Sequence, residues 1–428
     1  MKSYFARTFY SLDSKQYRVL FAGTVFSFLG MQMQVIARGF LAYDLTGKNS
    51  ALGGVMLAFG LPQLILGLWG GVLADRLQKR RLLVVTHALV AVNSLWLAVM
   101  IELGMVEYWM LLAAGVVQGA GFAFIGPARQ AFISDLVGKE AIGNAVVLQQ
   151  LSMNSTRVIG PSLAGAFIAI SFIGVGGVYM VTTLGFIIAA VTMLRLPPGM
   201  PRANAADRSP LADMRDGLSY VRHRPGIALL ISISFAVVMI GFPYQSFLPS
   251  IAKSQFQVAS SGLGLLSSVG AVGAVGATIV VATYASHPRA FFYQPFLGIG
   301  FGVAVVGLGL APNFPAGLLM MVLVGGLASA FQSLNNALTM SLCDSEYTGR
   351  VQSISMLSWS LFGLVALPLG MLADAIGLRE TLVIMGAGCV LSVAVLELVG
   401  RALGASEDRR PRIAGVDLDP VEAGGGGS

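Results

Sequence analysis

Uncharged, apolar runs of about twenty residues recur along almost the whole chain, and this repetition limits the fold more than any other feature. One of them, residues 52–69, reads LGGVMLAFGLPQLILGLW and contains no charged side chain. A run of this length crosses a bilayer as a helix, because a helix satisfies its own backbone hydrogen bonds in lipid. Charged residues make up 11% of the chain, whereas soluble domains contain about 25%. The sequence therefore predicts an all-α membrane protein.

Twelve transmembrane helices are expected. Their predicted spans are 19–43, 51–74, 82–103, 109–134, 144–170, 175–195, 226–249, 260–284, 291–311, 315–341, 351–372 and 380–402. An even number of crossings leaves both termini on the same side of the membrane. The N-terminal stretch lacks the short apolar core and small-residue cleavage site of a signal peptide, so we expect no cleaved leader.

The basic residues are distributed unevenly between the two sides that this topology defines. Most of the 27 Lys and Arg residues, Arg129 among them, fall on the side of the termini. Arg38, Lys48, Lys253 and Arg379 are assigned to the opposite side, and Arg157 lies within a helix. Cytoplasmic segments carry the excess of Lys and Arg. We therefore predict a multi-pass protein of the cytoplasmic membrane with both termini cytoplasmic. The net charge of +7 reflects this topology and does not imply nucleic-acid binding.

The only long polar connection, residues 195–226, divides the chain into two sets of six helices. Within it, SPLADMRDGLSYV predicts a short amphipathic helix on the membrane surface, with Pro210 at its first position. The expected divisions are residues 1–195, a cytoplasmic linker 196–225, residues 226–403 and a cytoplasmic tail 404–428. The tail ends in GGGGS, which resembles an artificial flexible linker and carries no information on the fold.

The two sets of six helices resemble each other weakly. Gly119 and Pro161, in the fourth and fifth helices, match Gly326 and Pro368 in the tenth and eleventh. Such a repeat predicts two six-helix bundles related by a pseudo-two-fold axis. Because small residues allow close backbone approach in membranes, we expect glycine pairs at helix contacts: Gly67/Gly71, Gly115/Gly119 and Gly298/Gly302.

The loop between the second and third helices carries a distinctive pattern, GGVLADRLQKRR at residues 70–81. It resembles the signature loop of the major facilitator superfamily, except that Gln78 stands where that family usually has Gly. The resemblance covers residues 10 to 403 and implies the family's twelve-helix fold. It also implies that Asp75 latches the two bundles together on the cytoplasmic side in the outward-facing state. Gly71 would permit the close contact, and Arg76 and Arg80 would support the latch, whereas Lys79 and Arg81 are interpreted as membrane anchors.

A stretch in the fifth helix, RVIGPSLAG at residues 157–165, resembles the antiporter motif of exporters in this superfamily. The matching residues are Gly160, Pro161 and Gly165, while Ala164 and Thr156 replace two glycines of the pattern. A proline within a helix removes a backbone hydrogen bond and creates a pivot. The surrounding residues resemble the branch that contains drug efflux pumps and the enterobactin exporter. A fourth-helix motif is incomplete, because Gly115 stands where exporters have Arg, which puts in doubt any proton transfer through that position.

Polar residues deep in the membrane are the candidates for the substrate path, since burying them is costly. Arg157, in the middle of the fifth helix, is expected to face either an anionic substrate or polar groups of neighbouring helices. Each amide is equally compatible with a hydrogen bond between helices. The complete candidate set is Gln32, Gln34, Gln118, Asn154, Arg157, Tyr244, Gln332, Asn335 and Trp359. Candidates for proton coupling are Asp44, Glu102 and Glu397, and His87 is interpreted as a structural donor. Asp44 and Glu102 fall near the outer boundary of the membrane, where we expect them to form an ion-pair network with Arg38.

These features predict a monomeric secondary transporter that exports amphipathic drugs or siderophore-like molecules by alternating access. Proton antiport is implied by the resemblance. The alternative is an importer, or a lipid or lysolipid flippase, with the same fold. A channel would require a polar stripe or ring, and an enzyme would require a motif such as Gly-x-Ser-x-Gly or His-Glu-x-x-His; neither occurs. We therefore expect no catalytic residue, cofactor or metal, and the expected partners are a small-molecule substrate, protons and the bilayer.

Overall fold

A computed structural model describes residues 10–138, 141–170, 172–199, 210–258, 260–284, 287, 289–344 and 347–404, and within these ranges the regular structure is helical. The first six long helices are α2 (Lys15–Thr46), α3 (Asn49–Arg76), α4 (Lys79–Glu102), α5 (Tyr108–Leu136), α6 (Ile142–Ala169) and α7 (Gly174–Leu194). A short 3-10 turn, η1 (Tyr10–Asp13), precedes α2.

After the linker helix α8 (Pro210–Arg222), the chain forms a second set of six spans. The last five of these are α11 (Ser260–Tyr284), α12 (Ala290–Leu310), α13 (Phe314–Leu342), α14 (Thr348–Ile376) and α15 (Leu378–Ala402). Ten segments of the described chain are long and apolar enough to cross a membrane, and α14 adds a shorter apolar stretch, Leu361–Ile376. The structure confirms the all-α fold and fits twelve spans.

The seventh span differs from the single helix expected over 226–249, because it is broken and extends to residue 255. It consists of α9 (Pro225–Ala236), η3 (Val237–Gly241), η4 (Phe242–Gln245), α10 (Leu248–Ser250) and η5 (Ile251–Gln255). Pro243 and Pro249 each remove one helical hydrogen bond, and the chain adopts wider π turns at η3 and η5. Hydropathy could not reveal this break, since every piece is apolar.

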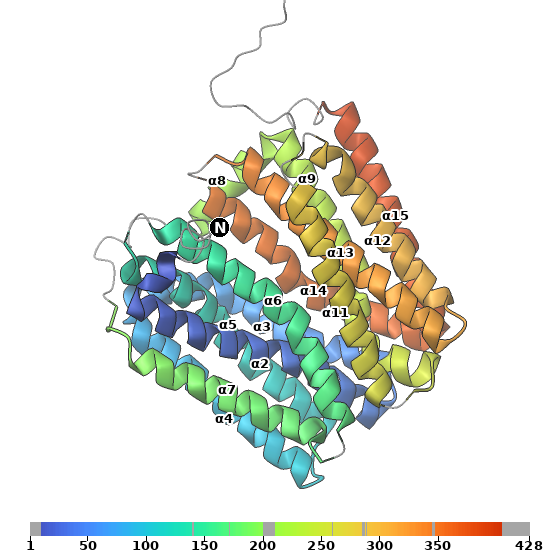
Figure 1. Ribbon diagram of the computed structural model, residues 1–428, viewed down its shortest axis with the longest axis horizontal. Coiled ribbons are helices and arrows are strands. Elements are labelled where there is room, and N and C mark those ends of the chain that lie inside the picture. Colours follow the sequence, from blue (N-terminus) through green and yellow to red (C-terminus); the bar gives the residue numbers. More distant parts are fainter. Residues whose placement is uncertain are drawn as a thin grey trace, which may run out of the picture.

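The packing pattern of the first six spans is repeated in the last six. Helix α3 packs on α5 and α4 on α7, just as α11 packs on α13 and α12 on α15. Between the two sets, α3 packs on α14, and α6 packs on α11 (Figure 1). These two contacts pair span two with eleven and span five with eight, so they exchange under a pseudo-two-fold rotation. The expected fold is confirmed in this respect.

The two ends of the molecule are organised differently. We call the end that holds α8 the α8 end, and the opposite end, where α2 finishes and α3 begins, the far end. The largest apolar cluster contains side chains from both sets of spans, such as Leu52, Tyr244 and Ala366. At the α8 end the clusters separate: one draws only on the first set, around Phe132, one draws only on the second set, and one draws on α8 and the second set. The two sets therefore share a core toward the far end.

The expected glycine contacts are confirmed at four positions and wrong at one. A methyl group on Gly119 would overlap the carbonyl oxygen of Phe59, and one on Gly302 would lie 2.7 Å from the carbonyl oxygen of Gly386. Gly115 and Gly298 are similarly enclosed, with their nearest atoms at 3.2 and 3.3 Å. Gly67 has no neighbour within 4 Å of such a group, because it lies on an open face of α3. The side-chain position of Gly71 lies outside the described part.

Candidate functional site

The far end is closed by direct backbone contact between α3 and α14. A side chain on Gly53 would overlap the backbone of Ala366, and one on Gly363 would lie 2.6 Å from the carbonyl oxygen of Met56. Nearer the far end, a side chain on Gly370 would lie 2.5 Å from the carbonyl oxygen of Asn49. Only glycine fits at such separations. Every close glycine approach described between the two sets of spans lies in the half of the molecule toward the far end.

Polar groups strengthen this closure at its rim. The Asp374 carboxylate of α14 accepts from the backbone N–H groups of Asn49 and Ser50, at 2.7 and 2.9 Å. These N–H groups begin α3, where the helix dipole favours a negative charge. The carboxylate of Asp44, at the end of α2, pairs with Lys253 of the seventh span at 2.5 Å. Both contacts join the first set of spans to the second, so opening the far end would break them.

The sequence placed Asp44 and Lys253 in separate outer loops and grouped Asp44 with Arg38 and Glu102. The structure gives these residues other partners: Asp44 pairs with Lys253, and Arg38 donates to Gln118. Glu102 is exposed at the end of α4 and approaches Gly176. The expected network of Arg38, Asp44 and Glu102 is therefore wrong.

The fifth-helix motif contributes to the same closure from the opposite side. A side chain on Gly165 would lie 2.6 Å from Cα of Gly264, which places α6 against α11 of the second set. Gly160 lies close to α2, since a methyl group added to it would lie 2.5 Å from Cβ of Gln32. Pro161 lies between these two contacts within α6. A proline inside a helix removes one backbone hydrogen bond, which makes a bend at this point less costly.

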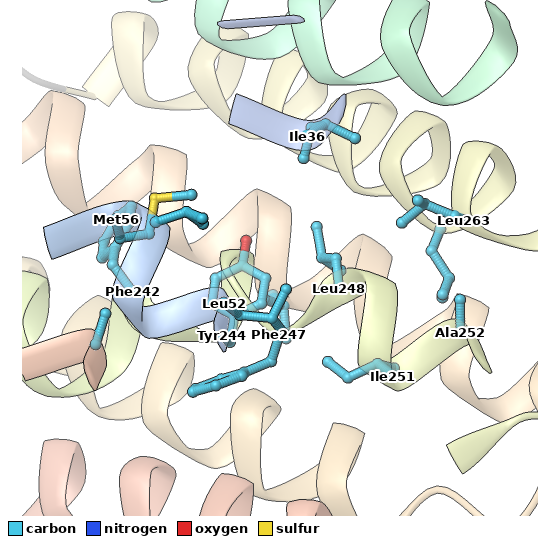
Figure 2. Close-up of a cluster of buried hydrophobic side chains, with 14 of the residues drawn as sticks. Ile36, Leu52, Met56, Phe242, Tyr244, Phe247, Leu248, Ile251, Ala252 and Leu263 are labelled. Atoms are coloured by element: carbon cyan, nitrogen blue, oxygen red, sulfur yellow. The ribbon is translucent and has the colours of Figure 1, made fainter. Parts of the chain in front are cut away.

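Apolar side chains from both sets of spans meet at the closure (Figure 2). Leu52 and Met56 of α3 lie beside Tyr244, Phe247 and Leu248 of the broken seventh span. Tyr244 is only 4% exposed, and its ring lies 6.0 Å from that of Phe301. Tyr244 is thus part of the packed closure in this state. The side chain of Trp359, its expected aromatic partner, lies outside the described part.

A hydrogen-bonded chain runs through the first set of spans. The guanidinium of Arg38 donates to Oε1 of Gln118, whose Nε2 donates to Oε1 of Gln34 at 2.6 Å. Nε2 of Gln34 then donates to Ser94 at 2.6 Å and Thr182 at 2.8 Å. Since Arg can only donate, it fixes the orientation of both amides. Gln34 and Gln118 are 1% exposed, so in this state they join helices.

Other expected substrate residues occupy different surroundings. In the second set of spans, Nε2 of Gln294 donates to Oδ1 of Asn335 at 2.9 Å, and both are buried. Gln32 and Gln332 are half-buried, and Oε1 of Gln332 has no hydrogen-bond partner within the described chain. Arg157 is half-buried near the middle of α6. The side chain of Asn154 lies outside the described part.

Carboxylates are scarce in the interior of the part that the structure describes. Asp44 and Glu102 are exposed at the far end, as the sequence predicted. Glu397 of α15 is 12% exposed and accepts from Nε of Arg401 at 3.2 Å. It is the least exposed of the three proton-coupling candidates. His87 is buried, with Nδ1 2.7 Å from the carbonyl oxygen of Leu83. That nitrogen must carry the proton and donate, so the interpretation of His87 as a structural donor is confirmed.

The loop at residues 70–81 is only partly described. The side chains of Gly71 and Asp75 lie outside the described part, and Arg76 is exposed. Nη1 of Arg80 donates to the carbonyl oxygen of Leu196 at 3.1 Å, which ties this loop to the end of α7. Lys79 is fully buried and pairs with Asp135 at 2.5 Å. The interpretation of Lys79 as a mere membrane anchor is therefore wrong.

At the α8 end, the linker helix is docked on the second set of spans. The ring of Tyr220 stacks on Tyr347 at 4.1 Å, and its hydroxyl accepts from the backbone N–H of Asp344 at 3.0 Å. Arg224 pairs with Asp344 at 2.9 Å. Asp216 pairs with Arg350 at 2.7 Å. Burial raises the pKa of Tyr220, so its hydroxyl stays protonated at neutral pH. Sequence analysis missed this docking because hydropathy reports no pairing between loops.

Two arginines that were counted toward the two sides of the membrane are buried. Arg38 was assigned to the outer side and Arg129 to the cytoplasmic side, and within their helices they are only 3% and 6% exposed. In each case the helix extends past the residue by two turns, to Thr46 and Leu136. The length of the apolar run beyond each arginine was the available signal.

Comparisons with known proteins agree with this architecture. A family profile described as "Transmembrane secretion effector" matches residues 6–415. The staphyloferrin A transporter of Staphylococcus aureus is 24% identical over 396 residues, covering 90% of this chain and 96% of that protein. Macrolide efflux protein A of Streptococcus pyogenes is 21% identical, covering 89% and 95%.

Among solved structures, a bacterial homologue of the human lysosomal transporter Spinster, in an inward-facing and unoccupied conformation, superposes with a TM-score of 0.74. It is 16% identical, and the match covers 92% of this chain and 99% of that one. The family profile spans nearly the whole chain, its relatives are transporters, and the fold is that of twelve paired spans. The chain therefore belongs to the transmembrane secretion effector family of the major facilitator superfamily and is a multi-pass membrane transporter.

Proposed function

We propose that this transporter exports amphipathic small molecules, drugs or siderophore-like compounds, across the cytoplasmic membrane in exchange for protons. The observation that carries the proposal is the closure of the far end by glycine contacts between α3 and α14, with separate apolar clusters at the α8 end. A transporter works by alternating access when two repeats rock around a central site. The described state then has its far end shut.

The α8 end is assigned to the cytoplasm by its charges. Arg76, Arg81, Arg195 and Arg222 are exposed there, and cytoplasmic segments carry the excess of basic residues. The described state is then inward-facing, and the repeats correspond to residues 1–195 and 226–403, with both termini cytoplasmic. The transporter works as a monomer, since the path runs between its own two repeats.

The proposed latch belongs to the opposite state. When the far end opens, the α8 end closes, and Asp75 of α3 locks the repeats together there with support from Gly71, Arg76 and Arg80. Gly160, Pro161 and Gly165 form the pivot in α6, since Gly165 contacts Gly264 across the two repeats. Rocking about this contact would exchange the two states.

The substrate path lies between the repeats. Arg157, Gln32 and Gln332 are half-buried and are the candidates best placed to meet a substrate, together with Asn154 and Trp359. Gln34, Gln118, Asn335 and Tyr244 are buried in this state and would contribute only after rocking. Glu397 is the preferred proton carrier, because it is the least exposed of the three candidate carboxylates; Asp44 and Glu102 are the others.

The test is a flux assay in proteoliposomes with an imposed pH gradient and a panel of macrolides, siderophores and fluorescent dyes. Export should be driven by protons moving in the opposite direction, and Glu397→Gln should abolish this coupling. Asp75→Asn should lose flux while retaining substrate binding, and unchanged transport by Arg157→Ala would remove that residue from the path. Uptake in the direction of the proton gradient, or movement of lipids alone, would instead favour an importer or a flippase.

A further inference from the structure

Arg129 is a buried cation in the first set of spans with unused donors. It lies in α5, is 6% exposed, and its Nε and Nη1 have no hydrogen-bond partner within the described chain. Its Nη2 lies 3.6 Å from Sδ of Met153. Its guanidinium carbon lies 4.5 Å from the centre of the Phe28 ring. The side chain thus reaches from α5 to the place where α2 and α6 pack together.

A buried guanidinium in this situation is costly. Buried charges are ordinarily paired with an opposite charge or fully hydrogen-bonded, and no ion pair of Arg129 occurs among the described residues. The ring of Phe28 compensates only part of the cost, because a cation–π contact leaves the N–H groups unsatisfied. Arg38, another buried arginine of this half, differs in that its Nη2 donates to an amide oxygen of Gln118. Arg129 is therefore the stronger candidate for an anion site.

Two polar side chains on α6 share this position. Gln149 is 2% exposed with both amide atoms unpartnered, and Ser152 is 7% exposed with its hydroxyl unpartnered, within the part of the chain that the structure describes. Residues 149, 152 and 153 fall within about one helical turn of each other. Gln149 and Ser152 thus lie beside Met153, the residue that Arg129 contacts.

The register of α2 against α6 supports this grouping. Tyr17 of α2 donates to the carbonyl oxygen of Ala145 at 2.7 Å, and Gln32 lies against Gly160 further along the same two helices. In both contacts the two partners are 128 residues apart in the sequence. The two helices therefore keep the same register from the first contact to the second. Gln149 and Ser152 lie within this interval on α6, and Phe28 lies within it on α2. Gln149 and Ser152 therefore lie on the stretch of α6 that runs along α2, and Arg129 reaches both helices of this pair through Phe28 and Met153.

We propose that Arg129, Gln149 and Ser152 form a binding site for the carboxylate of an amphipathic organic acid. The guanidinium supplies charge and N–H donors on two nitrogens, and the amide and hydroxyl supply further donors. Phe28 and Met153 provide apolar walls for the rest of the molecule. The inference rests on the proposed function, which it narrows: the exported compounds carry an oxyanion head and an apolar body.

The test compares two probes that differ only in charge, a dansyl-labelled long-chain carboxylic acid and its methyl ester. Binding to the purified full-length protein is followed by energy transfer from its four tryptophans, with displacement by an unlabelled long-chain acid to separate bound probe from micelle-dissolved probe. The wild type should bind the acid at least about tenfold more tightly than the ester, as expected for a charge-assisted hydrogen-bonded contact.

The decisive variant is Arg129→Met, which keeps the length of the side chain and removes its charge. It should reduce the preference for the acid to below about twofold, and it should raise the Tm of the protein, because an unpaired buried charge is removed. The matched control is Arg195→Met, which removes one exposed positive charge at the end of α7 and should keep the preference. Equal binding of acid and ester by the wild type, or an unchanged preference in Arg129→Met, would overturn the site.

If Arg129→Met does not fold, the double variant Gln149→Leu with Ser152→Ala decides the question. It should weaken binding of the acid by about tenfold and leave binding of the ester unchanged; an undiminished preference for the acid overturns the site. The flux assay is scored separately. Export of the panel without any preference for acids refutes the carboxylate site and leaves the export function standing. Acid binding without export supports the carboxylate site and refutes the export function.

Discussion

The far end and the α8 end hold the transporter together by different means. At the far end, α3 and α14 touch backbone to backbone through Gly53, Gly363 and Gly370. At the α8 end, the described side-chain bonds of α8 go to the second set of spans, through Tyr220 and Asp216. The far end is thus a joint between the repeats, whereas α8 is fastened to one of them. In the proposed rocking motion, α8 would therefore move with the second repeat while the far-end joint opens and closes.

The largest effect is expected from a side chain added between α3 and α14 in the far-end joint. Gly53→Val would place a side chain on the backbone of Ala366, and overpacking of this kind costs about 1–3 kcal/mol. We expect the far end to open, with a ten- to hundredfold shift in population, at about 1.4 kcal/mol for each factor of ten. Distances between spin labels on the end of α2 and the start of α15, both at the far end, would measure it.

Gly67→Val is the matched control for this substitution, because it adds the same side chain to the same helix at a position with no neighbour within 4 Å. It should leave the label distances and the transport rate unchanged. An equal response from both variants would mean that α3 tolerates no added side chain, and the far-end joint would lose its special role.

The second prediction concerns the carboxylate that caps α3. Asp374→Asn removes the charge that accepts from the N–H groups of Asn49 and Ser50. The loss should weaken the closed far end by about 1–2 kcal/mol, or roughly tenfold in population. The same spin-label distances measure the shift. Glu380→Gln removes a neighbouring exposed charge at the start of α15 and should have no effect. A similar shift in Glu380→Gln would mean that any loss of negative charge near the far end, and not the loss of the cap on α3, opens it.

The third prediction sharpens the view of α8 as part of the second repeat. Tyr220→Ala removes the stack on Tyr347 and should loosen α8 by about 1 kcal/mol, which hydrogen exchange along α8 would report as a severalfold faster rate. Tyr220→Phe keeps the stack and loses only the hydroxyl that accepts from Asp344, so its exchange rate should fall between those of the wild type and Tyr220→Ala. Unchanged exchange in Tyr220→Ala would mean that α8 is held elsewhere.

The smallest expected effect is on Cys343, beside the docked helix. Burial raises the pKa of this thiol, so at neutral pH a smaller fraction is thiolate than in a free cysteine, and alkylation should be slower. The rate should rise with pH up to a higher pH than for a free thiol. Undocking α8 by Tyr220→Ala should expose the thiol and speed alkylation severalfold, because the loss of burial, the largest cause of the raised pKa, outweighs the loss of the Tyr220 hydrogen bond, which lowers the pKa. Cys389 is fully buried and serves as an unreactive internal reference.

The sequence predicted the spans well because a bilayer requires every span to be a long, apolar helix with few charges. For α11 the expected range 260–284 is the observed one, and Pro210 begins α8 as predicted. The seventh span escaped the rule because hydropathy does not distinguish a straight helix from one broken at Pro243 and Pro249. Gly67 was misread for a related reason: spacing identifies glycines that can face a neighbour, but it does not say where the neighbour lies.

The candidate site was less predictable, since its partners come from distant segments. Arg38 and Arg129 were counted toward the two sides of the membrane, and their burial was missed, because a count of basic residues carries no information on depth. The contacts Asp374–Asn49 and Asp44–Lys253 join residues from opposite repeats, and such pairings depend on the conformational state as well as on the fold. The roles proposed for Asp75 and Arg157 stay predictions for the flux assay.

The far-end joint has a consequence for repeated use. Interlocking side chains must find matching rotamers each time two surfaces meet, and they lose conformational freedom on doing so. Gly53, Gly363 and Gly370 have no side chain to arrange, so α3 and α14 can part and rejoin at one fixed depth without that entropic cost. In the proposed transport cycle, the far-end joint can therefore form in the same way each time. Its strength can be adjusted by substitutions at the rim, at residues such as Asp374, without changing the glycine contacts.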